Sequence, residues 1–376
     1  MSLVALSRDK QYYFPEGNVV LLVSPMLFKV HRHILARDGS IFENMFTLDG
    51  IAGNVPGSPE NSNSQLNVFQ QDGSDDESPI VLQGDTPSDF RCLLQCLYAL
   101  PQDIAHWMSF GANSSDLGLL TSVLMMAHKY HFVTTESWAS RTLLEHIHDL
   151  PPSGRILSEH MLVRISEVAT KSSDEALLAV VRTRWRRLIA ENRHLGPALT
   201  TTELVGPRSL QGLAYLAVLL QGRSFWNAEP SLTREHRIRL LSGFHNLTHF
   251  CAALPDTPPP FAHRAGCADA RKCEESWARI WRGVFVDLGS DGQAVRGGGE
   301  GGLEARMQVR HHHLDVVGRL MMAISIVNVI PATPDLAEIL GGGFASTVCE
   351  GAAMDAVVAF SRKTQDELMD FFEDVV

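Results

Sequence analysis

Cysteine and histidine gather in the C-terminal half of the chain, where thiolates and imidazoles together would bind a soft metal ion. The residues nearest to a zinc set are Cys251, His263, Cys267 and Cys273, with His245 and His249 upstream. The paired thiolates of compact zinc fingers lie about two to four residues apart, and these cysteines do not. We therefore predict that Cys251 ends a buried helix face and that the chain has no metal site. A metal-binding tail is the alternative.

Other residues that could do chemistry lack a recognisable arrangement. The imidazoles of His31-Arg32-His33 could hold a metal or transfer protons, whereas those of His311-His312-His313 would fan around a helix and face solvent. We find no Ser/His/Asp or Cys/His signature, no GxGxxG and no Walker motif. The glycine run at 297–302 has neither a preceding strand nor a Lys-Ser/Thr ending. We predict no catalytic residue, no cofactor and no small-molecule substrate, so the chain is not expected to be an enzyme.

An arginine-rich segment opposes an apolar row over residues 173–193. The arginines are Arg182, Arg184, Arg186, Arg187 and Arg193, and the apolar row is Leu177, Val181, Trp185, Leu188 and Ile189. Such a face could dock an acidic partner or nucleic acid. We favour the interpretation that these arginines form the solvated face of an amphipathic helix.

Composition limits the class of protein. A length of 376 residues predicts two domains, and a net charge of −11 argues against nucleic acid as the main partner. A transcriptional regulator stays an alternative that would need a DNA-binding element. Six scattered cysteines form no disulfide framework, and we see neither an export signal nor an apolar run long enough for a membrane. These features predict a protein of the cytoplasm, the nucleus or both.

The N-terminal third predicts a small sheet with helices. Residues 18–23 form an apolar, β-branched run, and residues 26–30 alternate after a turn at Ser24-Pro25, so both segments are expected strands. A third strand follows at 80–82. Helices are expected over 31–36, 40–46, 117–130 and 135–150. A further helix begins near Thr86, where Pro87 and Asp89 are typical of a first helical turn.

Segments rich in glycine, proline and polar residues divide the chain. Residues 49–78 predict a disordered insertion, because their few apolar side chains cannot offset the entropy of ordering. Pro151-Pro152-Ser153-Gly154 is the predicted domain boundary. Residues 151–376 are expected to form an all-helical region with flexible loops near 255–266 and 289–302. No repeat of fixed period is present, which counts against a propeller or solenoid.

Several linked motifs resemble one known family. Residues 18–23, then Phe28-Lys29-Val30-His31-Arg32, Ile34-Leu35 and Phe42-Glu43-Asn44-Met45-Phe46, together with 80–98 and 120–150, are similar to the BTB/POZ domain. The resemblance covers 14–150, and the helical region after it resembles the tails of fungal BTB proteins. It implies an α+β fold, with a small sheet wrapped by helices, and His31 as a structural histidine that opens a helix.

The same resemblance implies a protein–protein interaction module that self-associates or scaffolds partners. The alternative function is a substrate adaptor of a cullin-type ubiquitin ligase, with cullin as a possible partner. Two departures bear on this: Asn18 stands where the family commonly has an acidic partner for the residue matching Arg32, and the cullin-binding hydrophobic-x-Glu element has no good copy before Ile80. The residues predicted to form the motif and its possible pocket are Asn18, Phe28, His31, Arg32, Leu35, Phe42, Met45 and Phe46.

Overall fold

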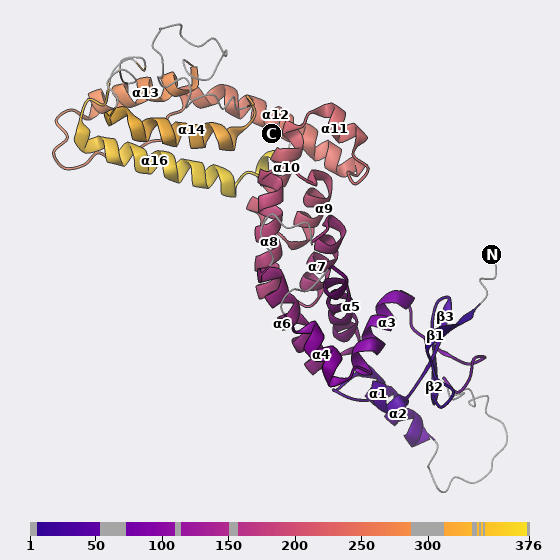
Figure 1. Cartoon of the computed structure of the whole chain (residues 1–376). Helices are drawn as coiled ribbons and strands as arrows, with labels where there is room; N and C mark the ends of the chain where they lie inside the picture. Colours follow the sequence, from indigo (N-terminus) through magenta and orange to yellow (C-terminus); the bar gives the residue numbers. More distant parts are fainter. Residues whose placement is uncertain are drawn as a thin grey trace, which may run out of the picture. The chain divides into compact units, whose positions relative to one another are not determined.

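The computed structural model describes residues 6–52, 73–109, 114–149, 157–286, 312–332 and 343–373, together with Ala337 and Leu340. The chain divides into two compact units, Met1–Arg184 and Trp185–Val376 (Figure 1). The first unit holds a small four-stranded sheet and several helices, and the described residues of the second unit form helices alone. The prediction of a mixed α+β chain that is mostly helical after its N-terminal sheet is confirmed.

The sheet has the strand order β1-β3-β2-β4. Its strands are β1 (Ser7–Tyr13), β2 (Val19–Val23), β3 (Met26–Val30) and β4 (Ile80–Val81). β2 and β3 form the expected antiparallel hairpin, in which Val19 lies opposite Val30. β4 and β1 join parallel to β2 and β3, respectively. The order places the most apolar strand, β2, in the interior of the sheet.

The core of the first unit is built around β2, whose residues Val19, Val20, Leu21 and Val23 are almost completely buried. A strand that is apolar on both faces must be covered on both faces. Large side chains supply that cover: Phe28 of β3 meets Phe90, from the helix after β4, at 5.0 Å between ring centroids. The remaining buried members include Leu35, Phe42, Leu93, Leu94, Met126 and Phe132.

The helices of the first unit follow the predicted positions closely. They are α1 (Arg32–Leu35), α2 (Ile41–Ala52), α3 (Pro87–Leu97), α4 (Pro101–Trp107), α5 (Ser114–Tyr130), α6 (Val133–Asp149) and α7 (Glu159–Lys171). α8 (Glu175–Ala190) begins in this unit and ends in the second. α3 starts as expected, since the Thr86 hydroxyl accepts a hydrogen bond from the Asp89 N–H. α4 was not predicted from the sequence.

A buried carboxylate joins three helices of the first unit. Asp89 of α3 accepts hydrogen bonds from Ser122 of α5 at 2.7 Å and from Arg164 of α7 at 2.5 Å. Thr86 donates a third, at 2.7 Å. This network explains why α7 belongs to the N-terminal unit although it follows the predicted boundary at 151–154. That boundary itself lies outside the described residues.

The segment 49–78, predicted to be a disordered insertion, is ordered at both ends. α2 continues through Ala52. From Gly73 the chain packs on the sheet: the Gly73 carbonyl accepts from the Val20 N–H at 2.8 Å, and Asp76 accepts from Arg8 and Tyr13. Asp76 thus binds β1, whereas Asp75 and Glu77 are exposed. The rest of the segment, 53–72, lies outside the described residues.

Strand β1 was missed because its sequence is polar and shows no alternation. Its position depends on contacts with residues that are far away in the sequence. Asp9 is buried, receives the backbone N–H groups of Gln11 and Tyr12, and accepts a hydrogen bond from Arg91 of α3 at 2.6 Å. One carboxylate therefore fixes both the bend of β1 and its attachment to α3.

The second unit contains α9 (Leu195–Val205), α10 (Arg208–Leu220), α11 (Arg223–Ala228), α12 (Arg234–Ala253), α13 (Ala270–Val286), α14 (Val316–Val329), α16 (Thr347–Asp366) and α17 (Asp370–Glu373). Short 3-10 turns, η1 (Leu254–Asp256) and η3 (Ile330–Ala332), follow α12 and α14. α9 and α11 were not predicted. The expected loop near 255–266 is described throughout and begins in η1, whereas the one near 289–302 lies outside the described residues.

α12 and α17 approach closely at a glycine. A Cβ added to Gly243 of α12 would lie 2.2 Å from the Phe372 ring of α17, too close for any real contact. Phe372 is fully buried and packs on Tyr215 at 5.1 Å between centroids. Further along, α13, α14 and α16 lie side by side (Figure 1). The glycine therefore allows the short terminal helix to close the core around α10 and α12.

Replacing Gly243 with alanine should destabilise the second unit by about 1–3 kcal/mol, because the added methyl group displaces the Phe372 ring. Alanine is otherwise the better helix former by about 1 kcal/mol. Gly351→Ala on α16 is the matched control, because nothing lies within 4 Å of its Cβ position. We expect the control to raise the free energy of unfolding and Gly243→Ala to lower it in denaturant titrations. Equal effects of the two would contradict the packing argument.

Asp89 should make the first unit sensitive to acid. Burial raises the pKa of Asp89, but hydrogen bonds from Ser122, Thr86 and Arg164 outweigh burial, so its pKa is lowered overall. A lowered folded-state pKa contributes stability that is present above the unfolded pKa near 4 and is lost as pH falls through the folded value. Asp89→Asn should therefore cost about 2–4 kcal/mol at pH 7 and less at pH 3. Parallel unfolding curves of both proteins over pH 3–7 test this; a pH-independent difference would count against it.

Candidate functional site

The residues predicted to form the BTB-like motif separate into a buried and an accessible group. Phe28, Leu35 and Phe42 are fully buried in the core of the first unit. Met45 and Phe46 of α2 pack on that core from the surface and are half-buried. The buried members hold the fold together, so only the accessible ones can meet a partner.

Asn18 and Arg32 are neighbours, as the pocket prediction requires, but their contact runs through the backbone. The Asn18 side-chain oxygen accepts a hydrogen bond from the Arg32 N–H at 2.7 Å, which satisfies a donor at the start of α1. The Arg32 guanidinium lies over the Phe46 ring, 4.8 Å from its centroid. Asn18 thus satisfies a backbone donor and does not pair with the Arg32 guanidinium, which lies over an aromatic ring.

His31 precedes the first residue of α1 and is in contact with Tyr98. Its backbone N–H donates to the Tyr98 hydroxyl at 3.1 Å, and its Nδ1 lies 2.9 Å from the same oxygen. Phe14 packs against both rings, at 5.5 Å from His31 and 5.3 Å from Tyr98. Together with Arg32 and Phe46 these residues form what we call the aromatic–arginine patch: Phe14, His31, Arg32, Phe46 and Tyr98.

The arginine-rich segment is largely engaged with its own surroundings. Arg182 pairs with Glu175 at 3.2 Å, and Glu191 receives Arg187 at 2.7 Å and Arg193 at 3.2 Å. The Arg184 guanidinium donates to the Ile147 carbonyl at 2.9 Å. The opposite row is buried as predicted, with Leu177, Val181, Trp185 and Ile189 in the cores of the two units. These contacts favour the solvated helix face over a docking face.

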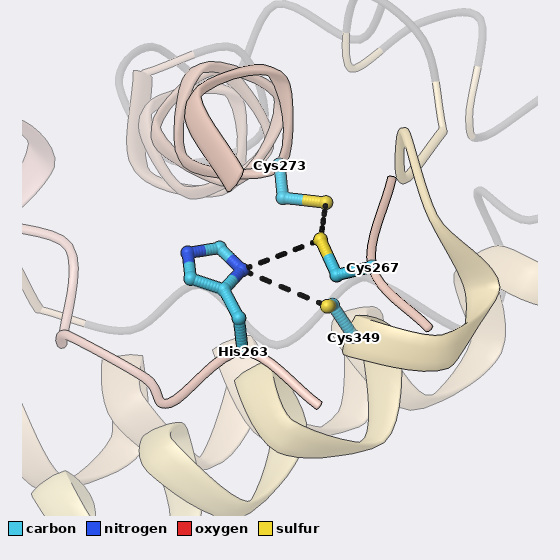
Figure 2. A group of neighbouring side chains, drawn as sticks. All are labelled: His263, Cys267, Cys273 and Cys349. Atoms are coloured by element: carbon cyan, nitrogen blue, oxygen red, sulfur yellow. Dashed lines mark hydrogen bonds between the residues drawn. The ribbon is translucent and has the colours of Figure 1, made fainter. Parts of the chain in front are cut away.

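Four metal-binding side chains converge in the second unit: His263, Cys267, Cys273 and Cys349 (Figure 2). Their ligand atoms all lie within 4.8 Å of one another. The Sγ atoms of Cys267 and Cys273 are 3.5 Å apart, and the His263 Nδ1 is 3.7 Å from the Sγ of Cys267 and 3.7 Å from that of Cys349. Cys273 and Cys349 are buried, and the other two are half-buried. We call this set the Cys/His cluster.

Three segments of the second unit position the Cys/His cluster. His263 and Cys267 flank a tight turn in which the Cys267 N–H donates to the Arg264 carbonyl at 3.1 Å. Gly266 has φ +95°, the backbone conformation that the third residue of a type II turn requires and that glycine adopts most easily. Cys273 lies in the first turns of α13 and Cys349 in the first turn of α16. The loop and two helix starts therefore face one another.

The imidazole of His263 is held from its far side as well. Its Nε2 lies 3.3 Å from the Glu274 carboxylate, so Nδ1 is left to face the thiols (Figure 2). Burial raises the pKa of the Cys273 thiol to about 12. The Arg264 backbone N–H and the His263 ring lower the pKa of Cys349 to about 7. The cluster thus combines thiols of different acidity with an oriented imidazole, an arrangement that can bind a soft metal ion or form a disulfide.

The sequence reading found three members of this cluster and missed the fourth. Cys349 is far from the others along the chain, so no local spacing indicated it. Cys251 lies outside the cluster, and it ends the buried face of α12 as predicted. His245 and His249 lie on the exposed surface of α12 with ring centroids 4.5 Å apart. His312 and His313 stack on each other at 4.3 Å, and His311 lies outside the described residues.

A second polar cluster in this unit is directed inward. Glu203 of α9 accepts hydrogen bonds from the Tyr215 hydroxyl at 2.6 Å and from Arg239 at 2.8 Å, and lies 3.0 Å from His236 Nε2. Burial raises the pKa of Tyr215, and its hydrogen bond to Glu203 raises it further. Because each group satisfies another, the network joins α9, α10 and α12 and explains their packing.

Comparison with protein-family models, with curated proteins and with solved structures found no match for this chain. Among the described residues, no helix is both long enough and apolar enough to cross a membrane.

Proposed function

We propose that the chain is a BTB/POZ-type interaction protein, which self-associates or scaffolds partners through its first unit and selects partners with its helical tail. In this proposal it binds proteins and catalyses no reaction. Its six cysteines, all free thiols in the structure, suit the reducing interior of the cytoplasm or nucleus.

The observation that carries the proposal is the order of elements in the first unit. The hairpin β2–β3 is followed by α1 and α2, then by β4 in parallel with β2, then by α3 and the pair α5 and α6. This is the order that the motif resemblance implies, and the motif residues Phe28, Leu35 and Phe42 occupy its core. The agreement between motif and topology supports a BTB-like unit.

The aromatic–arginine patch supports an assembly contact on that unit. Tryptophan, tyrosine and arginine are enriched among the residues that dominate the energetics of protein interfaces, and aromatic rings bury a large area there. Arg32 and Phe46 are half-buried and contact each other, so a partner would meet an ordered surface. Ordered contact residues lower the entropic cost of association.

An exposed apolar row supports a binding role for the tail. Ile238, Leu241 and Phe244 recur every three residues on α12 and are 49%, 54% and 46% exposed, respectively. Side chains at this spacing share one helix face. Such a face is a candidate contact for a partner helix, separate from the patch on the first unit.

Self-association predicts a mass above 41.4 kDa for the full chain in size-exclusion chromatography with light scattering. Arg32→Glu should shift the population toward the monomer. In a two-fold interface both protomers contribute the substituted residue, so the effect of the new charge is doubled. We expect the dissociation constant of the assembly to rise about tenfold or more.

Arg141→Glu is the matched control, since Arg141 is an exposed arginine on α6 of the same unit. It should leave the mass unchanged, and circular dichroism should show both variants folded. A wild-type chain that stays at 41.4 kDa at every concentration and retains no partner in affinity purification would contradict the proposal. So would equal effects of the two variants.

A further inference from the structure

We propose that His263, Cys267, Cys273 and Cys349 bind one zinc ion, which ties the loop before α13 to the starts of α13 and α16. The site would be structural, and it is independent of the interaction proposed for the first unit. Its basis is the geometry of the Cys/His cluster.

The distances between the ligand atoms fit one tetrahedral ion. Zinc–sulfur bonds of about 2.3 Å around a tetrahedral centre place two sulfur atoms roughly 3.8 Å apart, and a sulfur and an imidazole nitrogen roughly 3.6 Å apart. The observed separations are 3.5 Å for Cys267 and Cys273, and 3.7 Å from His263 to each of Cys267 and Cys349. Three of the six separations thus already match a tetrahedral ion, and all six lie within 4.8 Å.

The donor set selects the metal and its role. Three thiolates with one imidazole form a Cys₃His set, which is typical of closed structural zinc sites with no position left for substrate. Thiolate ligands disfavour magnesium and calcium, which prefer oxygen. The Glu274 carboxylate beside the His263 Nε2 is the outer partner that metal-binding histidines commonly have, and it fixes the tautomer that leaves Nδ1 free to bind.

The Cys349 thiol lies where negative charge is favoured. Cys349 is in the first turn of α16, whose positive dipole end stabilises a thiolate. The Arg264 backbone N–H donates to the sulfur of Cys349 and adds to this effect. The net negative charge of a zinc ion with three thiolates is thus partly compensated by the fold.

Aromatic side chains hold the ligand-bearing loop against α13. The Trp277 indole donates to the Pro259 carbonyl at 2.9 Å, and Trp281 donates to the Leu254 carbonyl at 2.7 Å. Phe261 contacts both Trp277 and the ring of His263, which lies 4.9 Å away. The loop is positioned by groups that are not ligands, so the chain presents its donors before the ion arrives.

A disulfide between Cys267 and Cys273 is the competing explanation for two of the four residues. It would account for neither Cys349 nor the orientation of His263, whose Nδ1 faces sulfur on two sides. Packing of cysteines as small apolar residues would not place an imidazole among them. A tetrahedral metal ion uses all four groups, and zinc is the ion that this donor set suits best.

Metal analysis of the full chain tests the site. Protein purified without chelators or a metal-affinity column should contain about one zinc per chain by mass spectrometry. Cys349→Ser and Cys273→Ser should lose the zinc, and Cys251→Ser should retain it, because Cys251 is a buried cysteine of the same unit outside the cluster. Stoichiometric zinc in Cys349→Ser would overturn the assignment.

Two further variants keep the proposal testable if a serine variant does not fold. His263→Cys should retain zinc, since a Cys₄ set is an accepted structural site, whereas His263→Ala should lose it. Glu274→Gln should weaken zinc binding about tenfold by removing the outer partner of His263. Affinities can be measured by competition with a colorimetric chelator.

Cobalt substitution reports the geometry directly. Wild-type protein stripped of zinc and loaded with cobalt should show the visible bands of a tetrahedral ion and a thiolate charge-transfer band, and re-added zinc should remove them. Chelation should also lower the melting temperature, which zinc should restore. A wild-type chain without zinc whose peptides show a Cys267–Cys273 disulfide would overturn the proposal, as would stoichiometric iron or copper.

Discussion

The two-sided burial of β2 is the constraint on which the first unit depends. Because Val19, Val20, Leu21 and Val23 are nearly inaccessible, neither face of the small sheet can be left to solvent. Helices must cover both faces, and the polar groups at the helix ends must then find hydrogen-bond partners inside the unit. Asp89 and Asp9 meet that need: the first joins α3, α5 and α7, and the second attaches β1 to α3. Burial of apolar side chains determines how the helices pack on the sheet, and these two carboxylates fix the relative positions of the elements they join.

The second unit is held together differently. Its α9, α10 and α12 share the Glu203 network, while α17 closes on α12 because Gly243 leaves room for Phe372. Hydrogen bonds from the Trp277 and Trp281 indoles of α13 to loop carbonyls link this helix to the loop before it. The Cys/His cluster lies among these links, at the point where a loop meets two helix starts. A metal ion there would link this loop and the two helix starts by coordinate bonds.

Local chemistry explains what could be predicted from the sequence. The hairpin follows from two apolar runs around Ser24-Pro25, and α3 begins at Thr86 because hydroxyl, proline and carboxylate all suit a helix start. β1 could not be predicted, since its polar residues are placed by Asp76 and Arg91, which come much later in the chain. Cys349 was missed for the same reason. Its distance along the chain from His263, Cys267 and Cys273 does not indicate that the four residues are close in space. Histidine near cysteine in the sequence is nevertheless typical of metal sites.

The distribution of the Cys/His cluster along the chain has a consequence for biosynthesis. His263, Cys267 and Cys273 leave the ribosome together, but Cys349 follows only after α14 has been made. A nascent chain would therefore expose an incomplete, reactive trio of ligands for several seconds, at typical rates of about 5–20 residues per second. Oxidation or capture of the wrong ion in that interval would trap an immature form. In the proposed zinc site, Cys349 would thus be the last ligand to join.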